Sequence, residues 1–392
     1  MYKVLTLNNI AVEGLRRLPR ERYEVASEIA HPDAILLRSH NMHDMDIPDT
    51  VAAVGRAGAG TNNIPCDALA HRGVPVFNAP GANANAVKEL TIAGLLLSAR
   101  NLCDAREYVK TLDDSGEGLK KKVEAGKKQF VGFELPGRTL GVIGLGAIGV
   151  EVANAALDLG MKVVGYDPAI TVRNAWQLSA GVEKAETLDQ LFQHADFVTC
   201  HVPLIDATRG IVNADRIALM NRSAVLINFA RGGIVDDAAA IAALDSGKLH
   251  AYVTDFPTTD LINHPKVIAL PHLGASTGEA EENCAIMVAE NVKDYLENGN
   301  IRHSVNFPEA RLPRLDAWRI TIANANVPNM VGQISTCLAS AGLNIEDLLN
   351  KSIGDLAYTI VDVNGEPSEE LLQKLRDIDG VLALRNLGKP VT

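Results

Sequence analysis

Residues 140–167 read LGVIGLGAIGVEVANAALDLGMKVVGYD. A short apolar run, of the kind that forms a buried parallel strand, leads into a turn that contains Gly144, Gly146 and Gly149. Apolar residues then recur at helical spacing, and a second apolar run ends on Asp167. The stretch therefore predicts a strand, a glycine turn, a helix and a second strand that ends on an acid.

Each glycine of this turn has a physical role in binding a dinucleotide. Gly144 permits the tight turn, Gly146 lets the backbone approach a pyrophosphate, and Gly149 lets the helix pack against the strand. The phosphates then lie on the unpaired amides at the helix N-terminus. Asp167 follows Gly149 by 18 positions, close to the ~20 expected for an acid that binds the ribose hydroxyls. A carboxylate there repels a 2′-phosphate, so the pattern favours NAD over NADP; the alternative is a purely structural glycine turn.

Length and composition limit the classes of function. The chain has 392 residues, enough for two or three domains, and its 47% hydrophobic and 22% charged content is ordinary for a globular enzyme. The net charge of -11 argues against general nucleic-acid binding. The five cysteines lack metal-ligand spacing, and no secretion signal or long apolar segment is present. We therefore expect a soluble cytoplasmic protein without a metal site.

Alternating strands and helices fill most of the chain. In the first hundred residues we expect strands at 3–7, 34–37, 53–56 and 74–78, and helices at 12–18 and 86–99. Residues 101–136 are polar and carry a helix, after which we expect strands at 197–200, 224–228, 251–255 and 267–270 and a helix at 236–246. Alternation of this kind predicts a doubly wound parallel sheet with its ligands at the strand ends.

The last part of the chain has a different order of elements. Residues 277–298 predict one long amphipathic helix, and residues 307–315 a linker. Beyond the linker we expect strands at 318–324, 344–351, 356–363 and 381–385, and helices at 330–341 and 368–378. This β-α-β-β-α-β order is that of a ferredoxin-like domain.

Two residues that directly follow apolar strands are candidates for the chemistry. Arg231 can grip a substrate carboxylate with two parallel hydrogen bonds, or it can form a salt bridge to Asp236 or Asp237. His272 can accept the proton that an alcohol loses on oxidation by hydride transfer, or it can be a packed or capping histidine. In the first region, residues 38–39, 56–60 and 78–85 are strand-end loops that suit an anionic substrate, and composition does not rank them.

Four motifs carry a resemblance to a known family. They are RAGAGTNNI at 56–64, GLGAIG at 144–149 with YDP at 166–168, NFARGGIVDD at 228–237 and PHLGAST at 271–277. In this order they resemble the D-isomer-specific 2-hydroxyacid dehydrogenases. The resemblance implies a doubly wound NAD-binding domain at 101–272, inserted in a flavodoxin-like substrate-binding domain at 1–100 and 273–307. It also implies an ACT domain, of βαββαβ fold, at 316–392.

The resemblance also assigns roles to individual residues. Arg231 holds the substrate carboxylate, and His272 accepts the hydroxyl proton as a hydride passes to NAD. The implied cofactor contacts are Gly144, Gly146, Ala147, Ile148, Gly149, Asp167, Val202, Pro203, Phe229, Ala230, Arg231, Asp255, His272 and Gly274. The implied substrate contacts are Arg38, Ser39, Arg56, Ala57, Gly58 and Asn83.

One position departs from the family. The family places a glutamate in a segment of the form LDVFxxEP, where the carboxylate hydrogen-bonds the histidine and makes it more basic. Residues 253–260 read VTDFPTTD, so Thr259 stands at the glutamate position. Asp260 could substitute, and Asp255 could serve the nicotinamide carboxamide. We expect an active enzyme with a shifted pH profile.

Within the family, PHLGAST together with an ACT-type module resembles the members that oxidise 3-phospho-D-glycerate to 3-phosphohydroxypyruvate in serine biosynthesis. The alternatives are another D-2-hydroxyacid dehydrogenase, such as a glyoxylate or hydroxypyruvate reductase, and a non-catalytic NAD-sensing protein. The resemblance implies a homo-oligomer, dimer or tetramer. It places L-serine as an effector on Asn324, Asn326 and Asn344; the alternative is an ACT domain that makes only dimer contacts.

Overall fold

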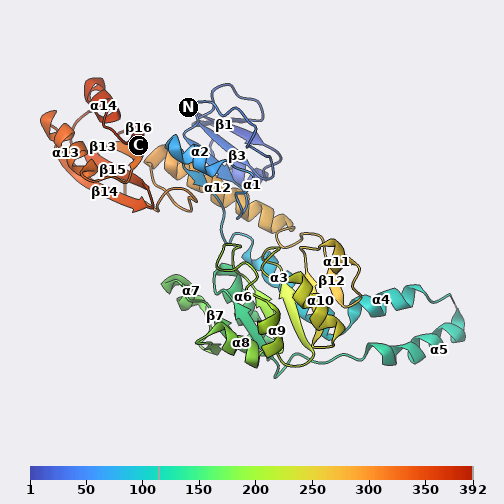
Figure 1. Ribbon diagram of the computed structural model, residues 1–392. Coiled ribbons are helices and arrows are strands. Elements are labelled where there is room, and N and C mark those ends of the chain that lie inside the picture. Colours follow the sequence, from blue (N-terminus) through green and yellow to red (C-terminus); the bar gives the residue numbers. More distant parts are fainter. Residues whose placement is uncertain (114, 391–392) are drawn as a thin grey trace. The chain divides into compact units, whose positions relative to one another are not determined.

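The structure, a computed structural model, describes residues 1–113 and 115–390. The chain divides into two compact units (Figure 1). Unit 1 comprises Met1–Ala82 and Glu281–Thr392, and unit 2 comprises Asn83–Ala280. Within the described ranges, no helix combines the length and the apolar character that crossing a bilayer requires.

Unit 1 begins with a five-stranded parallel sheet in the order β2-β1-β3-β4-β5. Its strands are β1 (Tyr2–Leu7), β2 (Tyr23–Ala26), β3 (Ala34–Leu37), β4 (Ala53–Arg56) and β5 (Val76–Phe77). The accompanying helices are α1 (Val12–Leu15), α2 (Cys66–His71) and the long α12 (Gly278–Asn298), which belongs to unit 1 from Glu281 onward. All four residues of β3 are buried, as an uninterrupted apolar run in a parallel sheet requires.

The C-terminal part of unit 1 is a four-stranded antiparallel sheet in the order β14-β15-β13-β16, which confirms the expected β-α-β-β-α-β module. Its elements are β13 (Trp318–Ala325), α13 (Met330–Ser340), β14 (Ile345–Ile353), β15 (Leu356–Val363), α14 (Glu369–Arg376) and β16 (Val381–Gly388). Successive residues of β15 serve different cores. Val361 packs with α13 and α14, whereas Ile360 packs in a core that contains Tyr295 of α12 and Phe307. The two sheets of unit 1 therefore share α12.

Unit 2 contains a seven-stranded parallel sheet in the order β12-β11-β10-β9-β6-β7-β8. Its strands are β6 (Thr139–Ile143), β7 (Lys162–Tyr166), β8 (Val182–Lys184), β9 (Phe197–Cys200), β10 (Ala224–Asn228), β11 (Leu249–Thr254) and β12 (Val267–Ala269). Its helices include α3 (Ala84–Ala99), α6 (Ala147–Asp158), α7 (Val172–Gln177), α8 (Leu188–His194), α9 (Ala214–Leu219), α10 (Asp237–Asp245) and α11 (Thr259–Ile262).

Helices cover both faces of this sheet, as the predicted doubly wound fold requires. Val225 and Ile227 of β10 pack in the core that contains α3 and α6, whereas Leu226 between them packs in the core that contains α8, α9 and α10. Because all strands are parallel, their carboxyl ends share one edge, where a doubly wound sheet binds its ligands. The predicted cofactor residues all lie in unit 2, in the turns and loops that follow β6, β7, β9, β10, β11 and β12 and in the first turn of α6.

Residues 101–136 hold more structure than the one helix expected there. α4 (Leu102–Lys110) and α5 (Gly116–Gly126) extend together from the rest of unit 2 (Figure 1), followed by the short 3-10 helix η1 (Lys127–Phe130). The Tyr108 hydroxyl donates to the carbonyl oxygen of Lys122 over 3.0 Å, and the Tyr108 ring lies 5.4 Å from the Phe130 ring. The hydrogen bond joins α4 to α5, and the ring contact joins α4 to η1.

Candidate active site

The glycine turn after β6 has the geometry of a dinucleotide-binding turn. Gly144 has a φ of +90°, in the region that favours glycine. A Cβ on Gly149 would lie 1.9 Å from the carbonyl oxygen of Gly144, so only glycine lets α6 start this close to the turn. A Cβ on Gly146 would meet no heavy atom within 4 Å, so the backbone there borders open space. That space is where a bound pyrophosphate needs to approach.

Asp167 follows β7 and is held against the same turn. Its Oδ2 accepts a hydrogen bond from the backbone N–H of Leu145, and its Oδ1 accepts one from Ala169, both over 2.8 Å. A carboxylate offers about four acceptor positions, so both oxygens keep capacity for ribose hydroxyls. α6 begins at Ala147 with no side chain capping its first amides, which leaves them for a phosphate. The residues present therefore fit NAD.

His201 forms one wall of the turn, and sequence reasoning missed it. Its carbonyl oxygen would lie 2.6 Å from a Cβ on Gly144, and the side chain of Val202 would lie 2.7 Å from the same position. A hydrogen bond of 3.0 Å joins its Nε2 to the Thr199 hydroxyl, and burial lowers the pKa of His201 to about 3. The imidazole is therefore neutral at physiological pH. Its position directly after β9 was the available clue.

The loop after β10 presents Arg231. The buried Asn228 side chain shapes this loop, because its Oδ1 accepts from the N–H of Ala230 over 3.1 Å and its Nδ2 donates to the carbonyl oxygen of Arg231 over 2.9 Å. Arg231 Nη1 donates to the carbonyl oxygen of Ala230 over 2.7 Å, and in the described part of the chain the guanidinium forms no ion pair. Asp236 instead caps α10 by accepting from Ala239. The salt bridge that was the alternative for Arg231 is absent among these residues.

His272 lies in the exposed turn after β12, next to Phe256. The two rings are 4.6 Å apart between centroids, and a Cβ on Gly232 would lie 3.6 Å from the Cβ of Phe256. The loop that carries Arg231 and the loop that carries His272 therefore both border Phe256. A Cβ on Gly274 would also lie 3.8 Å from the carbonyl oxygen of Phe229. Arginine and histidine thus share one neighbourhood of unit 2.

The family glutamate has no counterpart at the expected position. Thr259 begins α11 and is exposed, and so is Asp260. Burial raises the pKa of Asp237, the Thr258 hydroxyl lowers it by donating over 3.2 Å, and the charges of Asp236 and Asp260 raise it further. Asp260 therefore acts on the Asp237 carboxylate at the start of α10.

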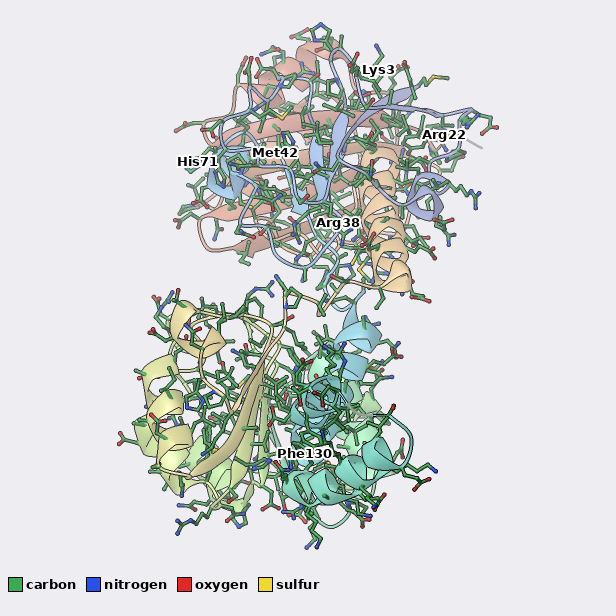
Figure 2. The ribbon with its side chains drawn as sticks, turned by 90° about the vertical axis from the view of Figure 1, so that its right-hand side faces the viewer. Lys3, Arg22, Arg38, Met42, His71 and Phe130 are labelled. Atoms are coloured by element: carbon green, nitrogen blue, oxygen red, sulfur yellow. The ribbon has the colours of Figure 1, made fainter. Side chains whose placement is uncertain are left out.

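The remaining predicted substrate residues lie in unit 1, apart from Asn83. Arg38 follows β3 and is marked in Figure 2; its Nη1 lies 2.7 Å from Oε1 of Glu281. Arg56 Nε donates to the carbonyl oxygen of Arg38 over 3.1 Å, so the two arginines are neighbours. A Cβ on Gly58 would lie 2.3 Å from Arg56 Nη1, so a larger residue there would displace the end of the Arg56 side chain. Ser39 and Ala57 follow the ends of β3 and β4, and the N–H of Ala57 donates to the carbonyl oxygen of Leu37 over 2.8 Å.

Asn83 precedes α3 at the start of unit 2. Its side-chain Oδ1 is buried and has no hydrogen-bond partner among the described residues. A buried acceptor without a donor is costly, so this oxygen is suited to receive a donor from a ligand.

A small cavity of about 150 Å³ lies in the C-terminal module, between β13, β14, β15 and the start of α13. Four of its nine lining residues carry amide side chains: Asn324, Asn326, Asn329 and Asn350. Asn344, the third residue expected to contact an effector, does not line it; the backbone N–H of Asn344 instead donates to Asn364 Oδ1 over 3.0 Å. The sequence missed Asn350 because the alternation of side chains along β14 decides which asparagines face the cavity.

Comparisons with known proteins agree with this architecture. Residues 92–274 match the family described as D-isomer specific 2-hydroxyacid dehydrogenase, NAD binding domain. D-3-phosphoglycerate dehydrogenase of Haemophilus influenzae is 33% identical over 385 residues, which cover 95% of this chain and 90% of that protein. The enzyme of the same name from Methanocaldococcus jannaschii is 35% identical over 352 residues, 87% of this chain, but the match spans only 63% of that longer protein.

Among solved structures, NAD⁺-bound 3-phosphoglycerate dehydrogenase of Entamoeba histolytica superposes with a TM-score of 0.60 at 25% identity, covering 78% of this chain and 99% of that one. The glycine turn, the acid after β7, the parallel seven-stranded sheet and these similarities lead to one conclusion. The chain belongs to the D-isomer-specific 2-hydroxyacid dehydrogenases, with an NAD-binding domain in unit 2.

Proposed function

We propose that this protein oxidises 3-phospho-D-glycerate to 3-phosphohydroxypyruvate with NAD. The observation that carries the proposal is the extent of the similarity to the Haemophilus influenzae D-3-phosphoglycerate dehydrogenase. It covers 95% of the chain and so includes most of the C-terminal four-stranded sheet. A relative with only the two parallel sheets in common would support the family but not this substrate.

Arg231 and His272 divide the chemistry at the hydroxylated carbon. Arg231 binds the substrate carboxylate with two parallel N–H donors, since no ion pair with a described residue occupies the guanidinium. His272 lies in an exposed turn and accepts the hydroxyl proton on its imidazole. NAD, when bound, accepts the hydride that leaves the same carbon. Phe256 packs against the His272 ring and limits its orientation.

Arg38 and Arg56 are proposed to bind the phosphate. They follow adjacent strands β3 and β4, and Arg56 Nε donates to the carbonyl oxygen of Arg38. Arginine suits a phosphate because its planar fork pairs with two oxygens at once. Burial raises the pKa of the nearby Cys284 thiol, and the charges of Arg38 and Arg56 oppose that rise. Both positive charges therefore lie close to the same thiol in unit 1.

The experiment is to follow NADH formation with 3-phospho-D-glycerate and with a panel of unphosphorylated D-2-hydroxy acids, D-glycerate and D-lactate among them. The proposal expects the phosphorylated acid to give the highest kcat/KM. A higher kcat/KM for an unphosphorylated acid would identify a different dehydrogenase of the family. The absence of turnover with every acid, in a protein that still binds NADH, would support a non-catalytic NAD-sensing role.

One observation favours the second candidate, a dehydrogenase for an unphosphorylated D-2-hydroxy acid. Arg38 already pairs with Glu281 at 2.7 Å, and this carboxylate offsets one of the two positive charges meant for the phosphate. The substrate of a glyoxylate or hydroxypyruvate reductase has no phosphate, so such an enzyme does not need a second positive charge at this place. The pair is partly exposed, so the attraction is weak and a phosphate dianion can replace the carboxylate.

The asparagine-lined cavity is proposed to bind L-serine as an effector. Asn324 is buried and Asn326 lies at the rim, and both offer amide donors and acceptors to a small zwitterion. Serine is expected to lower the rate of NADH formation, and Asn350→Ala to weaken this inhibition. A rate that stays constant as L-serine is added would leave the module with a role in subunit contacts only.

A homo-oligomer, dimer or tetramer, is also proposed. α4 buries none of its residues and α5 buries only Gly126, yet both carry apolar side chains such as Val109 and Val123. Helices this short are marginal in water without packing, so a second copy of the chain is a suitable cover. Sedimentation equilibrium measures the subunit number directly.

A further inference from the structure

A carboxylate lies close to His272, and it does not occupy the position that the family uses for its glutamate. β11 ends at Thr254, and the next residue, Asp255, has a side chain that is only 1% exposed. Buried carboxylates need partners, because removing a charge from water is costly. The contacts of Asp255 therefore indicate its role, given the proposed function.

Asp255 holds the turn that carries His272. Its Oδ2 accepts a hydrogen bond from the backbone N–H of Gly274 over 3.0 Å. A Cβ on Gly274 would lie 3.5 Å from the same oxygen, an ordinary van der Waals distance, so the backbone of the turn lies directly against this carboxylate. The other oxygen, Oδ1, is buried and has no partner among the described residues. One oxygen is thus committed to the turn, and the other is left without a donor.

The charges around Asp255 favour His272 as its partner. Burial raises the pKa of Asp255, whereas the N–H of Gly274, the charge of His272 and the N–H of Leu273 lower it, in that order of importance. On neighbouring elements, Arg231 follows β10, Asp237 begins α10 and Asp260 lies in α11, and none of these three is among the largest influences on the pKa of Asp255.

We propose that Asp255 is the positioning residue of His272. It fixes the turn at residues 272–274 through backbone hydrogen bonds and supplies the negative charge that stabilises the imidazolium formed when the substrate hydroxyl is deprotonated. The carboxylate that the family takes from the start of the following helix comes here from the end of β11. Thr259 is uncharged, and Asp260 is exposed and contributes to the pKa of Asp237, so the buried Asp255 is the better candidate for this role.

The test compares Asp255→Asn with Asp260→Asn, which removes an exposed carboxylate five residues further along the chain. Two titrations are measured: the acid limb of kcat/KM against pH, and the imidazole resonance of His272 by NMR in protein without substrate or cofactor. Asp255→Asn is expected to move both midpoints to lower pH by about one unit, because a nearby negative charge favours the protonated form. Asp260→Asn is expected to leave both in place.

A rescue experiment separates charge from shape. Asp255→Glu, and Asp255→Asn combined with Thr259→Glu, are expected to return the NMR midpoint toward the wild-type value. If Asp255→Asn unfolds, Asp255→Glu is compared with the wild type instead. A His272 NMR midpoint that moves to lower pH in folded Asp255→Glu, which keeps the negative charge, would contradict the proposal. The dissociation constant of NADH is measured in parallel. A weaker NADH affinity with unmoved midpoints would assign Asp255 to the nicotinamide carboxamide and overturn the proposal.

The NMR titration requires no substrate. Failure of 3-phospho-D-glycerate as a substrate would therefore refute the proposed function and leave the inference about Asp255 standing. An unmoved NMR midpoint in Asp255→Asn would refute the inference about Asp255 and leave the proposed function standing.

Discussion

At Gly146 and Gly149 the addition of one methyl group has opposite expected consequences. A Cβ at Gly146 enters open space, whereas a Cβ at Gly149 meets the carbonyl oxygen of Gly144 at 1.9 Å. Gly146→Ala is expected to leave the free energy of unfolding within about 0.5 kcal/mol of wild type. It should raise the dissociation constant of NADH about tenfold or more, because the methyl group fills the space left for the pyrophosphate.

Gly149→Ala is expected to lower the free energy of unfolding by about 1–3 kcal/mol, since α6 must shift away from the turn. Urea denaturation and NADH fluorescence titration measure the two quantities. Equal loss of stability in both variants would contradict the assignment of Gly146 to the cofactor.

Single residues also show what a sequence can and cannot predict. Asp167 was found from its spacing to the glycine turn, because both lie in one local strand-helix-strand unit. The contact between Asp255 and Gly274 joins residues 19 positions apart on loops after different strands, and no periodicity reports such a contact. Asn350 was missed for a similar reason, since its hydrogen bond to Thr359 depends on the register between β14 and β15.

At the scale of elements, the C-terminal end of α12 is fixed by side chains of the antiparallel sheet. Arg319 is fully buried, and its Nε and Nη2 each lie 2.6 Å from an oxygen of Asp362. Its Nη1 also donates to the carbonyl oxygen of Asn298 over 3.0 Å. Arg385 donates to the carbonyl oxygens of Tyr295 and Leu296 over 2.9 and 2.8 Å. These bonds join the antiparallel sheet to the last turn of α12, where the backbone carbonyl groups of a helix are available as acceptors.

Asp362→Asn is expected to destabilise the protein by about 3–5 kcal/mol, because it leaves the buried Arg319 guanidinium without its counter-ion. The matched control is Glu370→Gln, which breaks the exposed pair with Lys374 and is expected to cost less than about 1 kcal/mol. Denaturant unfolding of both variants gives the comparison. Similar small losses in the two would show that the Arg319–Asp362 pair does not hold the sheet to α12.

Strands with buried faces were the most predictable elements. β3, β4, β9, β10 and β15 have the bounds expected from their apolar runs. β2 and β8 were missed, since both lie at sheet edges and carry charged residues such as Glu24 and Lys184. An edge strand that faces water on one side lacks the continuous apolar run that identifies a buried strand.

At the scale of the whole molecule, the chain divides into two compact units, and the first α/β region and the C-terminal module, which the resemblance assigns to separate domains, lie in the same unit. The predicted first boundary was at residue 100, whereas unit 2 starts at Asn83. α3 belongs to unit 2 because Val87, Leu95 and Ala99 pack in the same core as α6. The C-terminal sheet belongs to unit 1 because Tyr358 and the preceding α12 share a core. Hydrophobic periodicity locates such helices but does not say which core they join.

This division gives each unit one part of the proposed reaction. Unit 2 carries the NAD-binding turn with Arg231 and His272, and unit 1 carries Arg38 and Arg56. The phosphate should therefore contribute to specificity through unit 1 alone. Arg16, an exposed arginine of the same unit, has no part in the proposal and serves as a control.

The ratio of kcat/KM for 3-phospho-D-glycerate to that for D-glycerate tests this account most directly, since the two substrates differ only in the phosphate. The account predicts a ratio of at least about 100 in the wild type, because each charge-assisted hydrogen bond contributes about 1.5–3 kcal/mol. The ratio should fall toward one in Arg38→Gln/Arg56→Gln and stay unchanged in Arg16→Gln. A wild-type ratio near one, or a high ratio that survives the loss of both arginines, would contradict it.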